Sequence, residues 1–168
     1  MGKKVLILGS DGMVGRCLYS YLSKNTELTV YGTSRKENIS ENMFILHTDH
    51  LEKDLLKIPQ VDYIINCIGK LKNSNADELR CVNGKFPHTL LGLVNKTKTI
   101  IIHISTDAVF DDQSKIVTES SIPNPNDIYG KSKLQGEIYS SPHITIRTSF
   151  LGIAEKGLIH WVQTTGEH

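Results

Sequence analysis

The stretch that decides the fold is Lys4-Val5-Leu6-Ile7-Leu8-Gly9-Ser10-Asp11-Gly12-Met13-Val14-Gly15, near the N-terminus. Its short apolar run predicts a strand buried on both faces, and the evenly spaced glycines predict a sharp turn into a helix. Without β-carbons, the backbone N–H groups of such a turn can approach phosphates, and the helix N-terminus adds partial positive charge. We therefore expect Gly9 through Gly15 to bind the diphosphate of a dinucleotide. A plain glycine-rich turn is the alternative.

Apolar runs and amphipathic segments alternate along the rest of the chain, which indicates an α/β protein. Strands are predicted at 4–8, 28–31, 43–46, 63–67, 99–104 and 144–147, and helices at 13–24, 51–57, 75–94 and 128–139. Short, continuously apolar strands that alternate with helices are typical of a parallel sheet between two helical layers. The predicted fold is a doubly wound parallel sheet (Rossmann fold) with three α/β/α layers, forming one NAD(P)-binding domain over residues 1–168.

The composition is that of an ordinary globular domain and excludes several classes of function. The 168 residues carry 19 Lys and Arg against 18 Asp and Glu, so no excess of cations is present to neutralise nucleic-acid phosphates. No apolar run approaches the roughly 20 residues that span a bilayer, and the N-terminal run is too short for a signal peptide. Three cysteines without C-x-x-C spacing favour reduced thiols. We expect a cytoplasmic protein with no nucleic-acid and no membrane partner.

The histidines do not predict a metal centre. His47 and His50 lie three residues apart, but Asp49 is their only close companion in the sequence, and a tetrahedral set of ligands is missing. No metal is therefore expected. His103, near the end of a predicted strand, is expected to be a packed core histidine.

The segment Tyr31-Gly32-Thr33-Ser34-Arg35 lies at the end of the second predicted strand, where a Rossmann domain meets the adenosine ribose. An acid at this tip pairs with a free 2′-hydroxyl, whereas a cation pairs with a 2′-phosphate. No acid stands within the segment, and the Arg35 guanidinium can contact a phosphate through two N–H groups. The sequence favours NADP, with NAD as the alternative if Arg35 is only a solvated loop residue.

Tyr129 and Lys133 lie one helical turn apart, so the phenol and the ammonium are predicted on one face of a helix. A neighbouring cation favours the phenolate, which brings the pKa of a tyrosine closer to values useful for proton exchange with a carbonyl or alcohol. A simple surface pair is the alternative. Upstream, His103-Ile104-Ser105-Thr106-Asp107 ends a predicted strand at the carboxyl edge of the sheet, where open α/β folds bind ligands. We expect Thr106 to donate a hydrogen bond to a substrate oxygen while Tyr129 transfers the proton.

Four motifs, in this order, resemble the extended short-chain dehydrogenases/reductases, and among them the dTDP-4-dehydrorhamnose reductase family of nucleotide-sugar reductases. They are Gly9-x-x-Gly12-x-x-Gly15, Ile104-Ser105-Thr106-Asp107-Ala108-Val109-Phe110, Tyr129-Gly130-Lys131-Ser132-Lys133-Leu134-Gln135-Gly136-Glu137 and Arg147-Thr148-Ser149-Phe150. The resemblance covers the chain from Lys3 to Phe150. It implies an NADP-dependent oxidoreductase that reduces the C4 keto carbon of a nucleotide-linked sugar in deoxysugar or polysaccharide biosynthesis.

The resemblance also implies roles for single residues. The implied catalytic residues are Thr106, Tyr129 and Lys133, with Tyr129 as proton donor and Lys133 also holding the nicotinamide ribose. Beyond the glycine-rich turn from Gly9 to Gly15, which we call the elbow, the implied cofactor contacts are Asp49 and His50 near the adenine, Ile68, Gly69 and Lys70 beside the cofactor, and Tyr129 and Lys133. Asn83 would fix local backbone or water, and Asp107 and Phe150 would lie near the substrate sugar.

Two departures from the family pattern keep other functions open. Ala108 stands where the family has a tyrosine, which removes a bulky group from the pocket wall. Extended members continue into a substantial substrate-binding portion, so this chain is expected to be truncated at its C-terminus, with 157–163 as the start of a further helix. The alternatives to a reductase are a dinucleotide-binding or regulatory module without turnover and a nucleotide-sugar epimerase on the same scaffold. A nucleotide sugar is the expected small-molecule partner, and a homodimer is one assembly compatible with the sequence.

Overall fold

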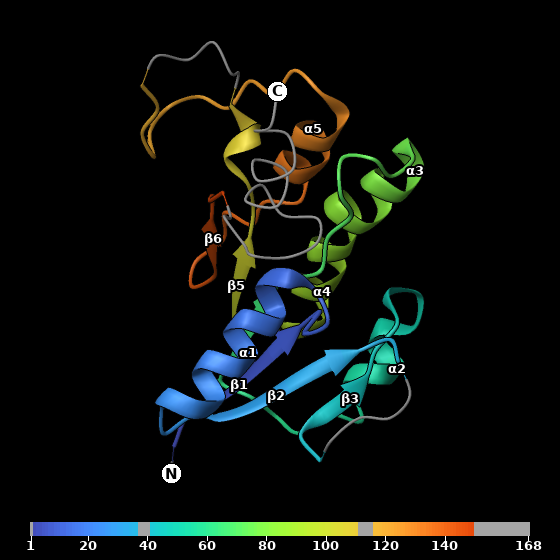
Figure 1. The fold of residues 1–168 in the computed structure, drawn as a ribbon, viewed down its shortest axis with the longest axis vertical. Coiled ribbons are helices and arrows are strands. Elements are labelled where there is room, and N and C mark those ends of the chain that lie inside the picture. The colour runs from blue at the N-terminus through green and yellow to red at the C-terminus, as the bar shows by residue number, and fades with distance from the viewer. Residues whose placement is uncertain (1, 37–40, 111–115, 150–168) are drawn as a thin grey trace, which may run out of the picture.

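The computed structural model describes residues 2–36, 41–110 and 116–149. These residues form a six-stranded sheet with the order β3-β2-β1-β4-β5-β6, in which all neighbouring strands are parallel (Figure 1). The strands are β1 (Lys4–Leu8), β2 (Thr29–Ser34), β3 (Met43–Ile45), β4 (Tyr63–Asn66), β5 (Ile100–Ile104) and β6 (Ile144–Ile146). The strand order changes direction between β1 and β4, which is the switch point of a doubly wound fold. The fold class predicted from the sequence is confirmed.

Helices connect the strands and cover both faces of the sheet. They are α1 (Met13–Asn25), α2 (Leu51–Leu55), α3 (Ala76–Glu78), α4 (Phe86–Val94) and α5 (Ile128–Gln135). A π-helical segment, Leu79–Lys85, joins α3 to α4, and 3₁₀ turns lie at Thr48–His50 and Asp107–Val109. No helix among the described residues is long and apolar enough to span a bilayer. The three cysteines are all free thiols.

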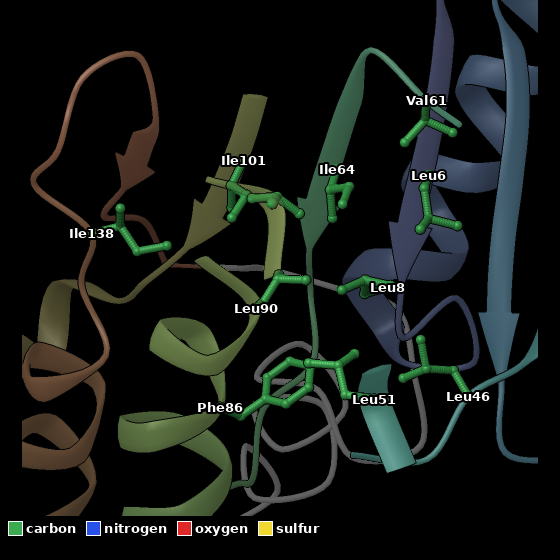
Figure 2. Packing of buried hydrophobic residues seen from close by; sticks show 11 residues of the cluster. Leu6, Leu8, Leu46, Leu51, Val61, Ile64, Phe86, Leu90, Ile101 and Ile138 are labelled. Carbon is green, nitrogen blue, oxygen red and sulfur yellow. The ribbon is translucent and has the colours of Figure 1, made fainter. Parts of the chain in front are cut away.

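Two apolar cores lie on opposite faces of the sheet, because successive side chains of a strand point to opposite sides. On one face, Val5 and Ile7 of β1 pack with Leu18 and Leu22 of α1. The larger core lies on the other face and includes β1 and β4 residues together with side chains from α2, α4 and the segment after α5 (Figure 2). The larger core includes Leu6, Leu8, Ile64, Ile101, Leu51, Phe86, Leu90 and Ile138. Burial of each such aliphatic side chain stabilises the fold by about 1.5–3 kcal/mol.

The second strand extends beyond its predicted end. The sequence predicts a strand at 28–31, but β2 continues to Ser34 because Gly32, Thr33 and Ser34 pair with β3. A Gly-Thr-Ser sequence favours a turn locally, and the long-range pairing overrides that preference. The extension carries two hydroxyl side chains to the carboxyl edge of the sheet. The bounds of the other strands agree with prediction to within one residue.

Two predicted helices differ most from the observed ones. The single helix expected at 75–94 contains the π-helical segment, a wider form that is frequent at functional sites. The helix expected at 128–139 ends at Gln135, where Gly136 forms the C-cap. A β-carbon at Gly136 would lie 1.9 Å from the backbone oxygen of Asn83, so the end of α5 packs directly on the π-helical segment.

Candidate active site

The glycine elbow has the geometry of a phosphate-binding turn. Gly9 has a positive φ of 79°, which only glycine adopts readily. A β-carbon at Gly15 would lie 2.2 Å from the Gly9 backbone oxygen, so the first turn of α1 can approach the end of β1 only without one. Gly12 is the N-cap of α1 and is exposed to solvent. The cradle that β-carbons would fill therefore fits a dinucleotide diphosphate.

Replacing Gly15 with alanine is expected to deform this elbow. The added methyl group meets backbone that cannot rotate away, so we expect the free energy of unfolding to fall by about 1–3 kcal/mol. NADPH binding, followed by calorimetry, should weaken at least about tenfold, since the helix N-terminus moves off the phosphates. Gly92→Ala is the matched control, because nothing lies within 4 Å of a β-carbon at that helical position. Equal NADPH affinity in Gly15→Ala and wild type would contradict a phosphate role for the elbow.

A cleft of about 210 Å³ lies between the elbow and the ends of the neighbouring strands. Its lining includes seven residues singled out from the sequence, which are Gly9, Asp11, Gly12, Arg35, Ile68, Gly69 and Lys70. The remaining lining residues are Thr33, Ser34, Leu46, Thr48, Cys67 and Val82. The structure thus brings the elbow, the end of β2 and the turn after β4 around one concave space.

Several predicted contact residues lie outside the cleft lining. Ser10 is buried and supports the elbow from within, donating to the Ile7 carbonyl at 3.0 Å and accepting from the Thr33 N–H at 3.2 Å. Met13, Val14 and Gly15 belong to the first turn of α1. Asp49 and His50 are exposed on their 3₁₀ turn, and Leu46 and Thr48 line the cleft instead. Phe150 and the helix expected at 157–163 lie outside the described residues.

The carboxylate of Asp11 lies at the end of the cleft where the ribose is expected. The sequence of β2 gives no sign of this acid. Asp11, from the elbow, accepts a hydrogen bond of 2.5 Å from the Ser34 hydroxyl. Ser34 also accepts from the Lys36 N–H at 2.9 Å, and Arg35 is exposed at the rim of the same cleft. A carboxylate and a guanidinium therefore share this end. The rule for the ribose-binding acid concerns residues at the end of β2, but this acid comes from a segment more than 20 residues earlier in the chain.

The turn after β4 is held by two buried asparagines. Asn66 accepts from the Ile68 N–H at 3.1 Å. Asn83, in the π-helical segment, accepts from the Lys70 N–H at 2.8 Å and donates to the Lys70 carbonyl at 3.1 Å. Asn83 also donates to the Ser132 hydroxyl at 3.1 Å, and Ser132 in turn donates to the Tyr129 carbonyl at 2.7 Å. The cleft wall and helix α5 are therefore connected through Asn83.

Tyr129, Thr106 and Asp107 gather where β5 ends and α5 begins. The N-cap of α5 is Asp127, which accepts from the Gly130 N–H at 2.7 Å, so Tyr129 lies in the first turn. Burial raises the pKa of Tyr129 above its usual 10, hydrogen bonding to Thr106 lowers it, and the Asp107 charge raises it further. The net effect keeps the phenol protonated. The sequence predicted that Lys133 would lower the pKa of Tyr129, and this prediction is wrong, because burial is the largest influence and raises the pKa.

Lys133 is a buried ammonium beneath the cleft wall. Its residue is 6% exposed, and Nζ donates to the Ile104 carbonyl at 2.6 Å. A β-carbon at Gly69, which lines the cleft, would lie 4.0 Å from this Nζ. Burial lowers the pKa of Lys133 from 10.5 to about 8, although the charge of Glu137 opposes this change. The ammonium thus approaches the cleft beside a residue that has no side chain.

Burying this ammonium is expected to cost stability in a pH-dependent way. The difference between a pKa of 10.5 unfolded and about 8 folded corresponds to about 3 kcal/mol. Between these pH values the unfolded chain binds the proton and the folded one does not, so the free energy of unfolding rises with pH. Urea unfolding of Lys133→Met should lack this rise, so that its stability relative to wild type is greatest below pH 8. The exposed neighbour in Lys131→Met is the control, and parallel pH curves for wild type and Lys133→Met would contradict the low pKa.

A second, larger hollow of about 650 Å³ has Asp107 in its lining. It is lined by Asp107, Phe110, Glu137, Tyr139 and Arg147 among others. The Glu137 side chain is fully buried and forms two hydrogen bonds with Arg147, at 2.9 and 2.7 Å. Arg147 also lies over the Phe110 ring, 5.1 Å from its centroid. Asp107 thus lines this hollow, and its charge also acts on Tyr129.

Comparison with known proteins identifies the family. Residues 3–162 match the model of the RmlD substrate binding domain. Methionine adenosyltransferase 2 subunit beta of Mus musculus is 30% identical over 143 residues, which cover 80% of this chain and 42% of that protein. A probable low-salt glycan biosynthesis reductase of Haloferax volcanii is 29% identical, over 78% of this chain and 46% of its own length. A solved dTDP-4-dehydrorhamnose reductase from Clostridium acetobutylicum superposes with a TM-score of 0.80 at 26% identity, covering 98% of this chain and 59% of that one.

The chain therefore spans less than half the length of these curated relatives. The similarity to a dTDP-4-dehydrorhamnose reductase agrees with the resemblance seen in the four sequence motifs. From the match over nearly its whole length, the chain belongs to the RmlD substrate binding domain family.

Proposed function

We propose that the chain carries the cofactor-binding and proton-transfer residues of an NADP(H)-dependent reductase that acts on a nucleotide-linked 4-keto-sugar. The observation that carries this proposal is the continuity of the cleft. It extends from the elbow at Gly9 to the turn at Gly69, where an added β-carbon would lie 4.0 Å from Lys133 Nζ. Lys133 shares helix α5 with Tyr129, whose phenol interacts with Thr106. The proposal therefore places the cofactor along the cleft and the proton donor on helix α5, next to the end of the cleft at Gly69.

The residues divide the chemistry in a simple way. The nicotinamide cofactor, when bound, supplies the hydride that reduces the sugar carbonyl. The elbow N–H groups and Arg35 would hold its phosphates, and Lys133 would hold its ribose. Tyr129 is protonated at neutral pH, so it can donate a proton to the oxygen that gains negative charge. Thr106 would stabilise the same oxygen with a second hydrogen bond.

Cofactor titrations test the charge arrangement at the ribose end. We expect NADPH to bind more tightly than NADH, and Arg35→Ala to weaken NADPH by about tenfold to a hundredfold while leaving NADH unchanged. Asp11→Asn should strengthen NADPH binding, because it removes a negative charge from the end of the cleft that Arg35 also lines. Lys36→Ala, at an exposed position next in the chain, serves as the control. Tighter binding of NADH, or equal losses for both cofactors in Arg35→Ala, would overturn the choice of NADP.

Turnover tests the reaction itself. Consumption of NADPH should be followed with dTDP-4-dehydrorhamnose and a panel of other 4-keto-sugar nucleotides. Net oxidation of NADPH with one of them is the expected result. Exchange at a sugar carbon without net consumption would instead indicate an epimerase, and binding of NADPH without either reaction would contradict the reductase.

The relatives named as subunits of methionine adenosyltransferase favour a second candidate function. In this alternative the fold is a dinucleotide-binding module that serves another enzyme and turns nothing over. Such a module would explain both the similarity to these subunits and the presence of a glycine elbow that can bind a dinucleotide. NADPH binding with no reduction of any keto-sugar nucleotide, unchanged by Tyr129→Phe, is the result that would select it.

A further inference from the structure

The turn Cys67–Lys70 forms one wall of the cofactor cleft, and its position depends on side-chain contacts from β4. All four of its residues line the cleft. The turn also touches the elbow, since a β-carbon at Gly9 would lie 3.1 Å from Ile68 Cγ1 and 3.3 Å from the Ile68 nitrogen. A small shift of Ile68 would therefore change both the space at the elbow and the position of the cleft wall. The group that fixes the Ile68 N–H is the side-chain oxygen of Asn66.

The Asn66 amide is in turn oriented by His103. The two residues are cross-strand partners of β4 and β5, and both are fully buried. Because Asn66 Oδ1 accepts from Ile68, its Nδ2 faces His103 Nδ1, at 3.1 Å, and donates to it. His103 Nδ1 must then be an acceptor, which requires a neutral ring with its proton on Nε2. Burial, followed by the charges of Lys133 and His88, lowers the pKa of His103 to about 3, so the ring stays neutral.

Packing alone does not explain a histidine at this position. Ile101, two residues earlier on the same face of β5, is an ordinary member of the larger apolar core. At His103 the Nε2 atom is buried with no hydrogen-bond partner among the described residues. A buried donor without a partner costs about 1–3 kcal/mol, so an aliphatic side chain would favour folding more. What histidine offers in return is the hydrogen bond that its Nδ1 accepts from Asn66.

We propose that His103 is a positioning residue for the cofactor cleft, acting through Asn66. Its Nδ1 selects one orientation of the Asn66 amide, that orientation holds the Ile68 N–H, and the Ile68 N–H holds the turn Cys67–Lys70 against the elbow. The inference rests on the proposed function only in naming NADPH as the ligand of the cleft. The chain of hydrogen bonds exists independently of which ligand binds.

Two substitutions separate positioning from packing. His103→Leu keeps an apolar side chain in the core and removes the acceptor, whereas His103→Asn keeps an acceptor near the position of Nδ1. We expect His103→Leu to speed amide hydrogen exchange at Ile68 by about tenfold or more and to weaken NADPH binding by a similar factor, as for the loss of one buried hydrogen bond. In His103→Asn, both the hydrogen exchange rate at Ile68 and the NADPH affinity should be close to the wild-type values. Ile101→Val, a small core truncation on the same strand and face, should leave both unchanged.

The outcomes are distinguishable from failure of the proposed function. If wild-type protein does not bind NADPH, the cofactor assignment fails, and exchange at Ile68 still decides the role of His103. Native exchange at Ile68 in His103→Leu, or equal impairment in His103→Asn and His103→Leu, would overturn the proposal. The ring state needs no variant: ¹⁵N NMR of the wild-type imidazole should show the neutral form with the proton on Nε2. A charged ring, or a proton on Nδ1, would also overturn it.

Discussion

Replacing Tyr129 with phenylalanine is expected to lower kcat for keto-sugar reduction by roughly 10²–10⁴-fold, the usual contribution of a positioned general acid. The ring remains and only the exchangeable proton is lost. Because burial raises the pKa of this phenol, the wild-type residue stays protonated throughout the neutral range and can donate at each turnover. NADPH affinity should change little, since the cleft lining does not include Tyr129. Steady-state kinetics and calorimetry on the same preparations measure the two quantities.

Tyr21→Phe is the matched control for this prediction. Tyr21 lies in α1 and is 61% exposed, so the same loss of a hydroxyl there should leave kcat unaltered. If Tyr129→Phe retains the wild-type kcat, the proton comes from another group and the assignment of Tyr129 is wrong. If kcat and NADPH affinity fall together, the substitution has disturbed the cleft and the specific role in proton transfer is not supported.

Glu137→Gln is expected to lower the free energy of unfolding by about 1.5–3 kcal/mol, because the hydrogen bonds to the partly exposed Arg147 lose their charged acceptor. The Glu137 carboxylate accepts from Arg147, from the Ser105 hydroxyl at 2.8 Å and from the Tyr139 hydroxyl at 2.5 Å. It thereby connects the end of β5, the residues after α5 and the residue that comes after β6. Burial opposes its ionisation, but these hydrogen bonds hold the pKa of Glu137 below its usual 4.5. Its contribution is therefore complete above that pH and is lost as the pH falls through the lower folded-state value.

Urea unfolding at pH 7 and below pH 4 measures this effect. At pH 7 Glu137→Gln should unfold at a lower urea concentration than wild type, and the difference should shrink as wild-type Glu137 becomes protonated. Combining Glu137→Met with Arg147→Met should recover much of the loss, because neither charge is then buried alone. Glu119→Gln, at an exposed position, is the control. An unchanged midpoint in Glu137→Gln would show that the ion pair contributes nothing to stability.

Local sequence signals predicted the fold well because its strands are short, apolar and separated by amphipathic helices. All six strands form where they were expected, and β1 and α1 begin at the predicted residues. The errors arise where tertiary contacts override local preference. Gly32 to Ser34 extend β2 only because β3 is there to pair with them. Asn83 of the π-helical segment likewise contacts Lys70 and Ser132, which are remote from it in the sequence.

The sequence predicted which segments would meet at the cleft, but not the contacts between side chains from separate segments. The elbow, Arg35 and the turn at Ile68 to Lys70 meet at one cleft, because the ends of parallel strands share an edge. The contact between Asp11 and Ser34 and the pair of Asn66 and His103 join separate segments, and no spacing rule reveals them. For Thr48, a hydroxyl just after the third predicted strand was a usable signal of a place at the cleft. The catalytic and contact roles assigned to individual residues remain predictions.

The π-helical segment has a consequence for how the chain tolerates changes in length. A π turn holds one residue more than an α turn, and here the surplus turns Asn83 toward Lys70 and Ser132. Deleting one residue from Leu79–Lys85 would return the segment to α geometry, and Asn83 would lose its contacts with Lys70 and Ser132 although α4 kept its orientation. Point substitutions on the exposed side of this segment should be far less harmful than a single-codon deletion, so natural relatives of this fold should vary there in composition while keeping the residue count constant.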